Sequence, residues 1–165
     1  MRDGVRGVVL GETALVSQFR VEREAGRTLA LANGCFDLLH VGHVRYLAGA
    51  AAAADRLVVA VNDDPSVAAL KGAGRPVQTA SERAELVAAF AMVDYVVVFP
   101  DRTVARLLSL LEPEVHCKGT DYTVDTVPER DVVRRYGGRT VIVGDDKNHS
   151  AAGLIGKIRD GQVPS

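Results

Sequence analysis

Two histidines, His40 and His43, follow a short apolar run and an Asn33-Gly34 turn. The apolar run predicts a buried strand, and the residue spacing from position 39 onward predicts a helix, so both imidazoles fall on one face of its first turn. There the helix has unpaired N–H groups and the positive end of its dipole, which favour an anion. The imidazoles can donate further hydrogen bonds to phosphate oxygens, and Gly42 leaves the surface between them open. The pattern therefore predicts a site for a triphosphate.

Other chemistry for these residues has less support. Two histidines at this spacing could be half of a zinc site or ordinary surface residues, but no Cys or carboxylate cluster with zinc-ligand spacing accompanies them. Cys35 has no Cys-x-x-Cys partner and no orienting triad, so we expect a close-packed residue rather than a catalytic thiol. Cys35 and Cys117 both end predicted strands, yet no secretion signal is present and we expect no disulfide between them.

Composition narrows the class of protein. The chain has 165 residues and a formal net charge of -1, which fits one domain and gives no basic field for nucleic acid or an anionic membrane. No apolar stretch approaches the ~20 residues that span a bilayer, and the N-terminus has no signal-peptide hydrophobic region. These features predict a cytoplasmic protein with no nucleic-acid or membrane partner.

Apolar runs that alternate with helical patterns predict a parallel sheet, and their continuity indicates burial on both faces. The expected strands are residues 29–32, 57–61, 95–99, 114–117 and 140–143. The expected helices are residues 40–54, 80–92, 102–111, 128–136 and 150–159, with a short turn near 65–70. An N-terminal helical extension, residues 1–27, contains a helix over 12–24. We predict a doubly wound, Rossmann-like α/β fold in which a parallel five-stranded sheet carries helices on both faces.

Polar residues collect directly after the strands, at the edge where such sheets bind ligands. They are Asn33 and the two histidines, then Asn62 and Asp63, and then residues 118–122 and 144–147. Independent segments that converge on one edge predict a site better than any single motif. The Gly-x-Gly-x-x-Gly fingerprint, the P-loop and the Gly-x-Ser-x-Gly elbow are absent, so a dehydrogenase, a P-loop kinase and an α/β hydrolase lack support.

The segments around this edge resemble those of a known family. Residues 33–37, followed by His40-Val41-Gly42-His43, resemble the signature of the cytidylyltransferase-like nucleotidyltransferases, which hold a triphosphate with His-x-Gly-His. Further segments resemble, in the same order, those of the adenylyltransferases that make ADP-heptose: residues 59–64, 70–72, 75–76, 81–83, 93–97 and 118–122. The resemblance covers about residues 28–160 and implies a nucleotidyltransferase domain over residues 28–165. Because only about 27 residues precede the first expected strand, it also implies a stand-alone transferase.

The resemblance implies transfer of AMP from ATP to a heptose 1-phosphate, with release of pyrophosphate. It implies Mg²⁺ bridging the triphosphate, without a dedicated metal cage in the protein, and a homo-oligomer such as a dimer. Catalytic roles carry over to His40, His43, Lys71 and Arg83. Nucleotide-binding roles carry over to Asn33, Gly34, Cys35, Phe36, Gly42, Lys118, Gly119, Asp121 and Ser150, and substrate-binding roles to Asp37, Asn62 and Asp63.

Lys71 and Arg83 also have simpler interpretations. Lys71 lies in a glycine-flanked loop that could close over the phosphates, or it could be a solvated surface lysine. Arg83 could contact nucleotide phosphate, or it could form a surface salt bridge with Glu82 or Glu85.

Five other polar residues are open to a structural reading. Asp37 could bind substrate hydroxyls or orient a basic partner, but it could also be a turn residue, as could Asn62 and Asp63. We expect His116 to be a strand histidine with satisfied hydrogen bonds and His149 to be a helix-start residue, and we assign neither a chemical role.

One departure from the family pattern concerns the last helix. Many relatives open it with Ser-Thr-Thr, whereas this chain has Ser150-Ala151-Ala152, so Ser150 alone could supply a hydroxyl and backbone N–H groups would replace the others. Two alternative functions stay open: a cytidylyltransferase for a polyol phosphate or phospho-alcohol, and a non-catalytic nucleotide-binding module.

Overall fold

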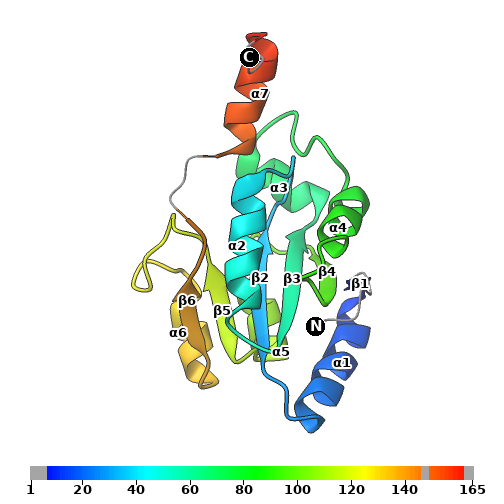
Figure 1. The fold of residues 1–165 in the computed structure, drawn as a ribbon, viewed down its shortest axis with the longest axis vertical. Coiled ribbons are helices and arrows are strands. Elements are labelled where there is room, and N and C mark those ends of the chain that lie inside the picture. Colours follow the sequence, from blue (N-terminus) through cyan, green and yellow to red (C-terminus); the bar gives the residue numbers. More distant parts are fainter. Residues whose placement is uncertain (1–6, 146–148, 162–165) are drawn as a thin grey trace.

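The computed structural model describes residues 7–145 and 149–161 (Figure 1). Within these residues one parallel sheet has the strand order β1-β4-β3-β2-β5-β6. The strands are β1 (Val8–Val9), β2 (Leu29–Gly34), β3 (Arg56–Asn62), β4 (Tyr95–Phe99), β5 (Val115–Lys118) and β6 (Arg139–Ile142). The predicted doubly wound parallel architecture is confirmed. The sheet nevertheless has six strands rather than five, because Val8 and Val9 pair with the start of β4.

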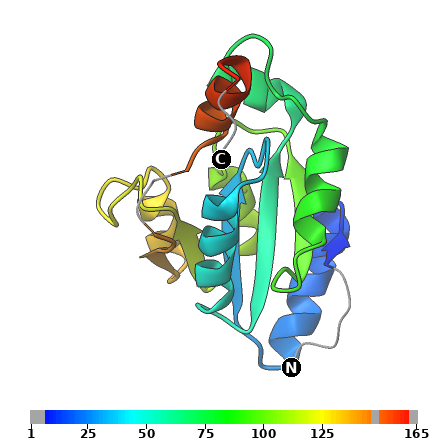
Figure 2. The same cartoon turned by 45° about the horizontal axis from the view of Figure 1, so that its top comes forward.

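Helices cover both faces of the sheet (Figure 2). They are α1 (Glu12–Glu24), α2 (Val41–Ala51), α3 (Asp64–Lys71), α4 (Ala80–Ala88), α5 (Ala105–Leu111), α6 (Arg130–Arg135) and α7 (Ala151–Arg159). On one face, α2 and α4 pack through Leu47 and Val87. On the other face, α1, α5 and α6 contribute Phe19, Leu107 and Val133. The predicted N-terminal helix thus shares the core of the sheet.

The turn expected near residues 65–70 is a helix, α3. Asp63 caps it by accepting a hydrogen bond from the backbone N–H of Ser66 at 2.8 Å. Pro65 lies in the first turn of the helix. A proline is tolerated there because backbone N–H groups in the first turn have no partner within the helix. The cap and the proline therefore start a helix where the sequence pattern alone favoured a turn.

The order of the strands reverses between β2 and β5, so the binding crevice expected of a doubly wound sheet lies at the carboxyl ends of these two strands. The chain leaves β2 toward α2 on one face and leaves β5 toward α6 on the other. β2 and β5 are direct neighbours, with Ala32 opposite Cys117. Doubly wound sheets bind ligands at such a switch point.

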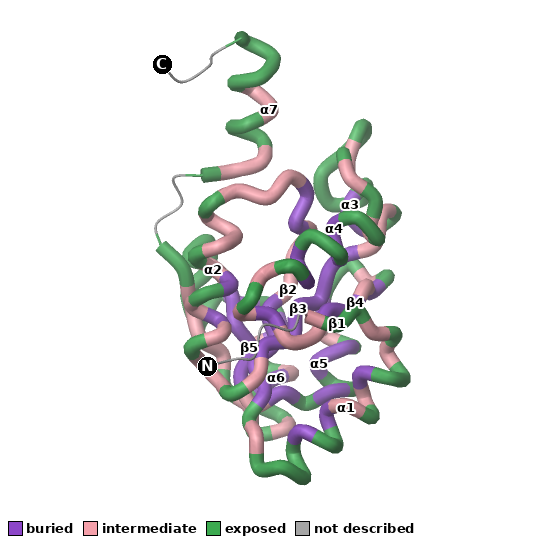
Figure 3. The backbone as a smooth tube through the Cα atoms, turned by 45° about the vertical axis from the view of Figure 1, so that its right-hand side comes forward, coloured by how far each residue is buried: buried purple, intermediate pink, exposed green. Residues whose placement is uncertain are grey.

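The last helix has little contact with the rest of the described chain. None of the residues of α7 is buried, and Figure 3 shows it standing away from the sheet without a buried segment. Among the residues that the structure describes, no helix is both long and apolar enough to cross a bilayer.

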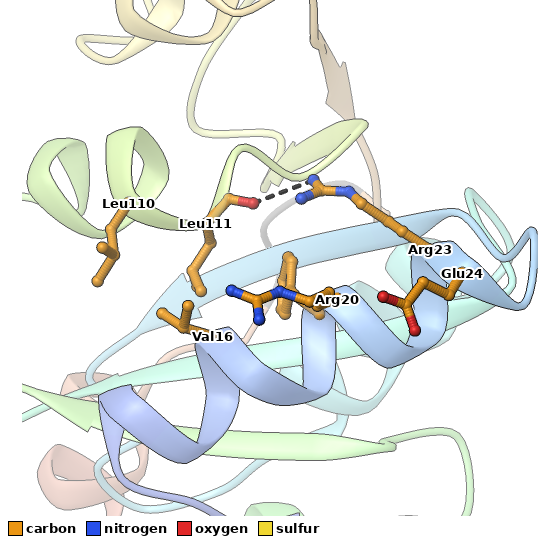
Figure 4. Close-up of a pocket in the computed structure, with 7 residues that line it drawn as sticks. Val16, Arg20, Arg23, Glu24, Leu110 and Leu111 are labelled. Carbon is orange, nitrogen blue, oxygen red and sulfur yellow. Dashed lines mark hydrogen bonds between the residues drawn. The ribbon is translucent and has the colours of Figure 1, made fainter.

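A shallow groove of about 270 Å³ lies between α1 and α5. Its lining includes Val16, Arg20 and Leu110, and Arg23 donates a hydrogen bond to the carbonyl of Leu111 at 3.0 Å (Figure 4). Both helices lie on the face opposite α2. The groove is therefore separate from the histidine pair.

A buried carboxylate joins α1 to the sheet at the face that α1 covers. Glu22 is 2% exposed and accepts hydrogen bonds from Arg27, Tyr95, Gln18 and Arg56. Burial opposes the charge, but the hydrogen bonds from these four side chains outweigh burial and lower the pKa of Glu22 to about 2.

Acid should therefore weaken the fold through Glu22. Because its pKa is lower in the folded chain than in the unfolded chain, its stabilisation is complete above about pH 4.5 and is lost as the pH falls toward about 2. We expect Glu22→Gln to lower the free energy of unfolding by about 3 kcal/mol at pH 7, and by much less at pH 3. Urea titrations at both pH values measure this, with the exposed Glu24→Gln as the control in the same helix. If Glu22→Gln lowered the free energy of unfolding equally at pH 3 and pH 7, the proposed stabilisation by a charged Glu22 would be contradicted.

Candidate functional site

The two histidines lie at the start of α2, as predicted. His40 is the N-cap residue, and its ring stacks on that of His43 with centroids 3.9 Å apart and planes 29° apart. The backbone N–H of His40 donates to Nδ1 of His43 at 3.3 Å. Burial, together with His40 and Lys71, lowers the pKa of His43 to about 4. His43 is therefore a neutral imidazole near pH 7 that carries its proton on Nε2, the nitrogen that can donate to a ligand.

Gly42 and Gly34 allow close packing around this pair. A Cβ on Gly42 would lie 3.0 Å from the ring of His40 and 3.6 Å from Cβ of His149, and a Cβ on Gly34 would lie 3.2 Å from the ring of Phe36. The Phe36 ring is buried, with its centroid 5.3 Å from that of His43. A Cβ at position 42 would therefore require the imidazole of His40 to shift slightly.

The loop between β2 and α2 is held by a buried carboxylate. Asp37 is 3% exposed and accepts hydrogen bonds from Arg75 at 2.6 Å, from the N–H of Val77 at 2.9 Å and from the N–H of Gln78 at 3.2 Å. Burial opposes its charge, but these donors prevail and hold the pKa of Asp37 below its usual range. Phe36 and Leu38 on either side have left-handed backbone conformations, with φ of 51° and 59°, which need such outside support. Asp37 thus orients a basic partner, one of the roles expected for it.

Arg83 lies behind this loop rather than on the surface. Its side chain is fully buried, and it donates to the carbonyls of Cys35 at 2.5 Å, Asn62 at 2.7 Å and Gln78 at 3.0 Å, and to Asp64 at 2.7 Å. The predicted alternative of a surface salt bridge with its helix neighbours is wrong, because the ion pair that forms is with Asp64. These four contacts use four of the five guanidinium N–H groups of Arg83.

Lys71 is the last residue of α3, followed by Gly72 with φ of 93°. Its side chain is exposed, and its charge contributes to the lowered pKa of His43. The lysine therefore lies near the histidine pair on an element that ends in a glycine.

Asn62 is the last residue of β3, Asp63 follows it, and the side chains of both have partners within the protein. Asn62 is 3% exposed and donates to the carbonyl of Asp101 at 3.1 Å, while Asp63 caps α3. Both side chains therefore have structural roles, but Asn62 lies in a strand and Asp63 caps a helix, so neither is the turn former that the sequence left open.

The other wall of the crevice comes from β5. Lys118 is 8% exposed and lies 3.4 Å from Oδ1 of Asn33, 3.6 Å from Glu129 and 5.1 Å from the ring centre of Tyr122. Burial lowers the pKa of Lys118, although the nearby Glu129 opposes that shift. Gly119 and Asp121 follow in the loop, where Asp121 is exposed.

The loops after β5 and β6 are tied to each other and to α2. Thr120 donates to the carbonyl of Asp145 at 2.7 Å, and Asp145 pairs with Arg45 of α2. Ser150 caps α7, accepting from the N–H of Gly153 at 3.0 Å. Residues 146–147, part of the polar segment predicted after the last strand, lie outside the described residues.

Neither cysteine takes part in a disulfide, as predicted. Cys35 and Cys117 are both unpaired thiols. Burial raises the pKa of both thiols, to about 12 at Cys117, so both are poor nucleophiles at neutral pH. Cys35 serves the site through its backbone carbonyl, which Arg83 holds.

Tyr46, His116 and Glu129 were not predicted as part of the site. The hydroxyl of Tyr46 donates to the carbonyl of Cys117 at 2.8 Å and accepts from the N–H of Asn33 at 3.3 Å. It therefore ties the histidine helix to both strands of the switch point. For Tyr46, its place one turn after His43 was the available signal in the sequence. Glu129 lies at the start of the helix predicted over residues 128–136, and nothing in that pattern indicated a role at the site.

Residues 31–157 match a protein family described as Cytidylyltransferase-like. The chain is 44% identical over 151 residues to "Bifunctional protein HldE" of Azotobacter vinelandii (strain DJ / ATCC BAA-1303), covering 92% of this chain and 32% of the relative. It is 46% identical over 150 residues to "Bifunctional protein HldE" of Geotalea uraniireducens (strain Rf4), covering 91% and 31%. The chain thus spans about a third of the length of these curated relatives.

A solved structure has the same fold. It is the lipopolysaccharide core biosynthesis protein from Thermoplasma volcanium GSS1, with a TM-score of 0.63 and 24% sequence identity. The similarity covers 73% of this chain and 98% of that one.

Proposed function

Because the chain belongs to the cytidylyltransferase-like family, we propose that it transfers AMP from ATP to a heptose 1-phosphate and releases pyrophosphate. The observation that carries this proposal is the stacked His40–His43 pair at the start of α2, the helix that follows β2 at the switch point of the sheet. Imidazoles at a helix N-terminus are suited to a triphosphate. The ADP-heptose motifs and the HldE relatives support the heptose as acceptor.

In the proposed reaction an oxygen of the sugar phosphate attacks the α-phosphorus of ATP in line. The bond from that phosphorus to the bridging oxygen breaks, and pyrophosphate leaves with the electron pair. Since no covalent bond to the protein is required, catalysis consists of positioning two anions and stabilising the charge on the leaving oxygens. Nε2–H of His43 and the imidazole of His40 supply hydrogen bonds, the N–H groups of α2 supply its dipole, and Lys71 supplies a cation.

A divalent metal accompanies ATP in such chemistry, and we propose Mg²⁺. Among the described residues no group of three or more His, Cys, Asp or Glu side chains could hold a metal ion. The donor set therefore fits a metal held chiefly by phosphate oxygens and water, and we assign no protein ligand to it.

The identity of the nucleotide tests the proposal against its closest rival. We expect pyrophosphate release with ATP, Mg²⁺ and a heptose 1-phosphate to be at least about tenfold faster in kcat/KM than with CTP, a difference of about 1.4 kcal/mol in transition-state binding. A coupled pyrophosphate assay with both nucleotides measures it. The family description agrees with cytidylyl transfer as the second candidate. Its acceptor would be a polyol phosphate or phospho-alcohol, and faster turnover with CTP would select it.

Lys71 offers a second test. Its exposed side chain at a glycine-flanked helix end implies contacts made mainly after the loop closes, so Lys71→Ala should lower kcat by about tenfold or more while weakening ATP binding by about threefold or less. Steady-state kinetics and calorimetric ATP titration measure the two quantities. Arg20→Ala, which removes an exposed cation on the opposite face, is the control. An unchanged kcat for Lys71→Ala would mean that Lys71 is a solvated surface lysine without a role in catalysis.

We also propose a cytoplasmic location, where ATP is supplied, and a homodimer as the assembly. Sedimentation analysis of the purified protein tests the dimer. A monomer at micromolar concentration would exclude it.

A further inference from the structure

Asn33 and two residues of β5 form a hydrogen-bonded group on the wall of the crevice opposite α2. Nε2 of His116 lies 3.2 Å and Nζ of Lys118 lies 3.4 Å from the same Oδ1 atom of Asn33. Side chains alternate along a strand, so these three residues share the face of the sheet opposite Cys117. Cys117 belongs to the core on the α2 face, and the group therefore faces α6.

The hydrogen-bonding capacity of these groups fixes their orientation. An ammonium can only donate, so the atom of Asn33 nearest Lys118 must be the carbonyl oxygen of its amide. Since that oxygen accepts, the ring nitrogen of His116 that faces it must carry a hydrogen. Nδ1 of His116 is then the unprotonated nitrogen, and it has no hydrogen-bond partner among the described residues. An unpaired lone pair at Nδ1 agrees with a neutral ring, and burial, followed by the charge of Lys118, lowers the pKa of His116 to about 3.

This orientation of the Asn33 amide leaves its nitrogen, Nδ2, available. Oδ1 of Asn33 accepts from two donors, which leaves the two hydrogens of Nδ2 directed away from His116 and Lys118. Within the described part of the chain, Nδ2 makes no hydrogen bond that would occupy it. Asn33 lies at the end of β2 and is only partly buried, and Lys118 beside it ends β5. Both donors therefore lie at the carboxyl ends of neighbouring strands, where a doubly wound sheet binds its ligand.

We propose that His116 is a positioning residue that turns the Asn33 amide so that Nδ2, together with Lys118, binds a phosphate group of one of the two substrates. This inference rests on the proposed function. Nδ2 of Asn33 and Nζ of Lys118 are donors only, although the ammonium also lies 3.6 Å from the carboxylate of Glu129. The two donors therefore select a group that only accepts hydrogen bonds. Without the N–H of His116, the amide can rotate and present its oxygen to the anion.

Two replacements of His116 separate this role from simple packing. His116→Leu keeps a similar volume and removes the donor, whereas His116→Gln keeps an N–H that can reach Asn33. We expect the dissociation constant of either ATP or heptose 1-phosphate to rise about tenfold in His116→Leu, and His116→Gln to restore most of that loss. Calorimetric titration with each substrate shows which phosphate is bound. Leucine and glutamine variants that behaved alike, or unchanged binding of both substrates in His116→Leu, would overturn the proposal.

A double-mutant cycle tests whether His116 acts through Asn33. In an Asn33→Ala background, His116→Leu should cause little further loss of binding, because the amide that it orients is gone. Thr140→Val, a change on β6 directly opposite His116 in the sheet, is the control for a general packing defect. Losses that multiply in the double variant would assign His116 a packing role and overturn the proposal.

Asn33→Asp covers the case in which a His116 variant fails to fold. Aspartate keeps an oxygen for His116 and Lys118 but puts a second, anionic oxygen in place of Nδ2. Binding of the affected phosphate should weaken more than about thirtyfold, and wild-type affinity would overturn the proposal. Because these titrations need no turnover, a protein that binds as expected but releases no pyrophosphate would refute the proposed reaction and leave the role of His116 standing.

Discussion

Replacing His40 or His43 by alanine should lower kcat by about 10²–10³, equivalent to roughly 3–4 kcal/mol of transition-state stabilisation. This loss in kcat is the one expected when a single preorganised hydrogen-bond donor to the developing charge is removed. His43 meets this requirement because its Nδ1 is occupied by the N–H of His40, which leaves Nε2–H for the ligand. Steady-state pyrophosphate release measures kcat, and thermal unfolding without nucleotide checks the fold. Both variants should fold, since neither histidine belongs to the buried core.

The double variant should cost less than the product of the two single losses. The rings stack with centroids 3.9 Å apart, so removing one leaves the other misplaced, and both serve one cluster of charge. Val41→Ala, an exposed side chain in the same turn, is the matched control and should keep kcat within about twofold. Near-normal kcat in both single variants would remove the histidines from the mechanism and favour a non-catalytic nucleotide-binding module.

Periodic patterns in the sequence were sufficient to predict the architecture. The runs that became β2 and β4 are continuous apolar segments, and burial on both faces of a parallel sheet requires that continuity. The two-residue strand β1 was missed because Val8 and Val9 form too short a run, and their side chains are largely exposed. α3 was missed because its start depends on a side-chain cap and a proline rather than on periodicity.

The histidine pair could be predicted because its spacing is local, whereas the surroundings of Arg83 could not. The carbonyls that Arg83 holds belong to Cys35 and Asn62, 48 and 21 residues away in the chain. The same limit applied to Asn33 and His116, which are 83 residues apart. Long-range pairs of polar groups carry no sequence period, so only the fold reveals them.

Arg83 should prove as important for stability as the histidines are for turnover. Arg83→Leu leaves the carbonyls of Cys35, Asn62 and Gln78 without their donor. If each unsatisfied carbonyl costs about 1 kcal/mol or more, the free energy of unfolding should fall by at least about 3 kcal/mol. Urea titration at pH 7 measures this loss.

Two variants locate the source of the effect. Asp64 is the exposed partner of Arg83, with 43% of its side chain accessible, so Asp64→Asn should cost less than about 1 kcal/mol. Arg83→Lys keeps the charge but can reach fewer of the carbonyls, and its stability should lie between those of the wild type and Arg83→Leu. If Arg83→Leu lost kcat but less than about 1 kcal/mol of stability, its main role would be the predicted contact with nucleotide phosphate. A large loss of stability would instead show that Arg83 acts mainly by holding the carboxyl ends of β2 and β3 in the positions that the ligand requires.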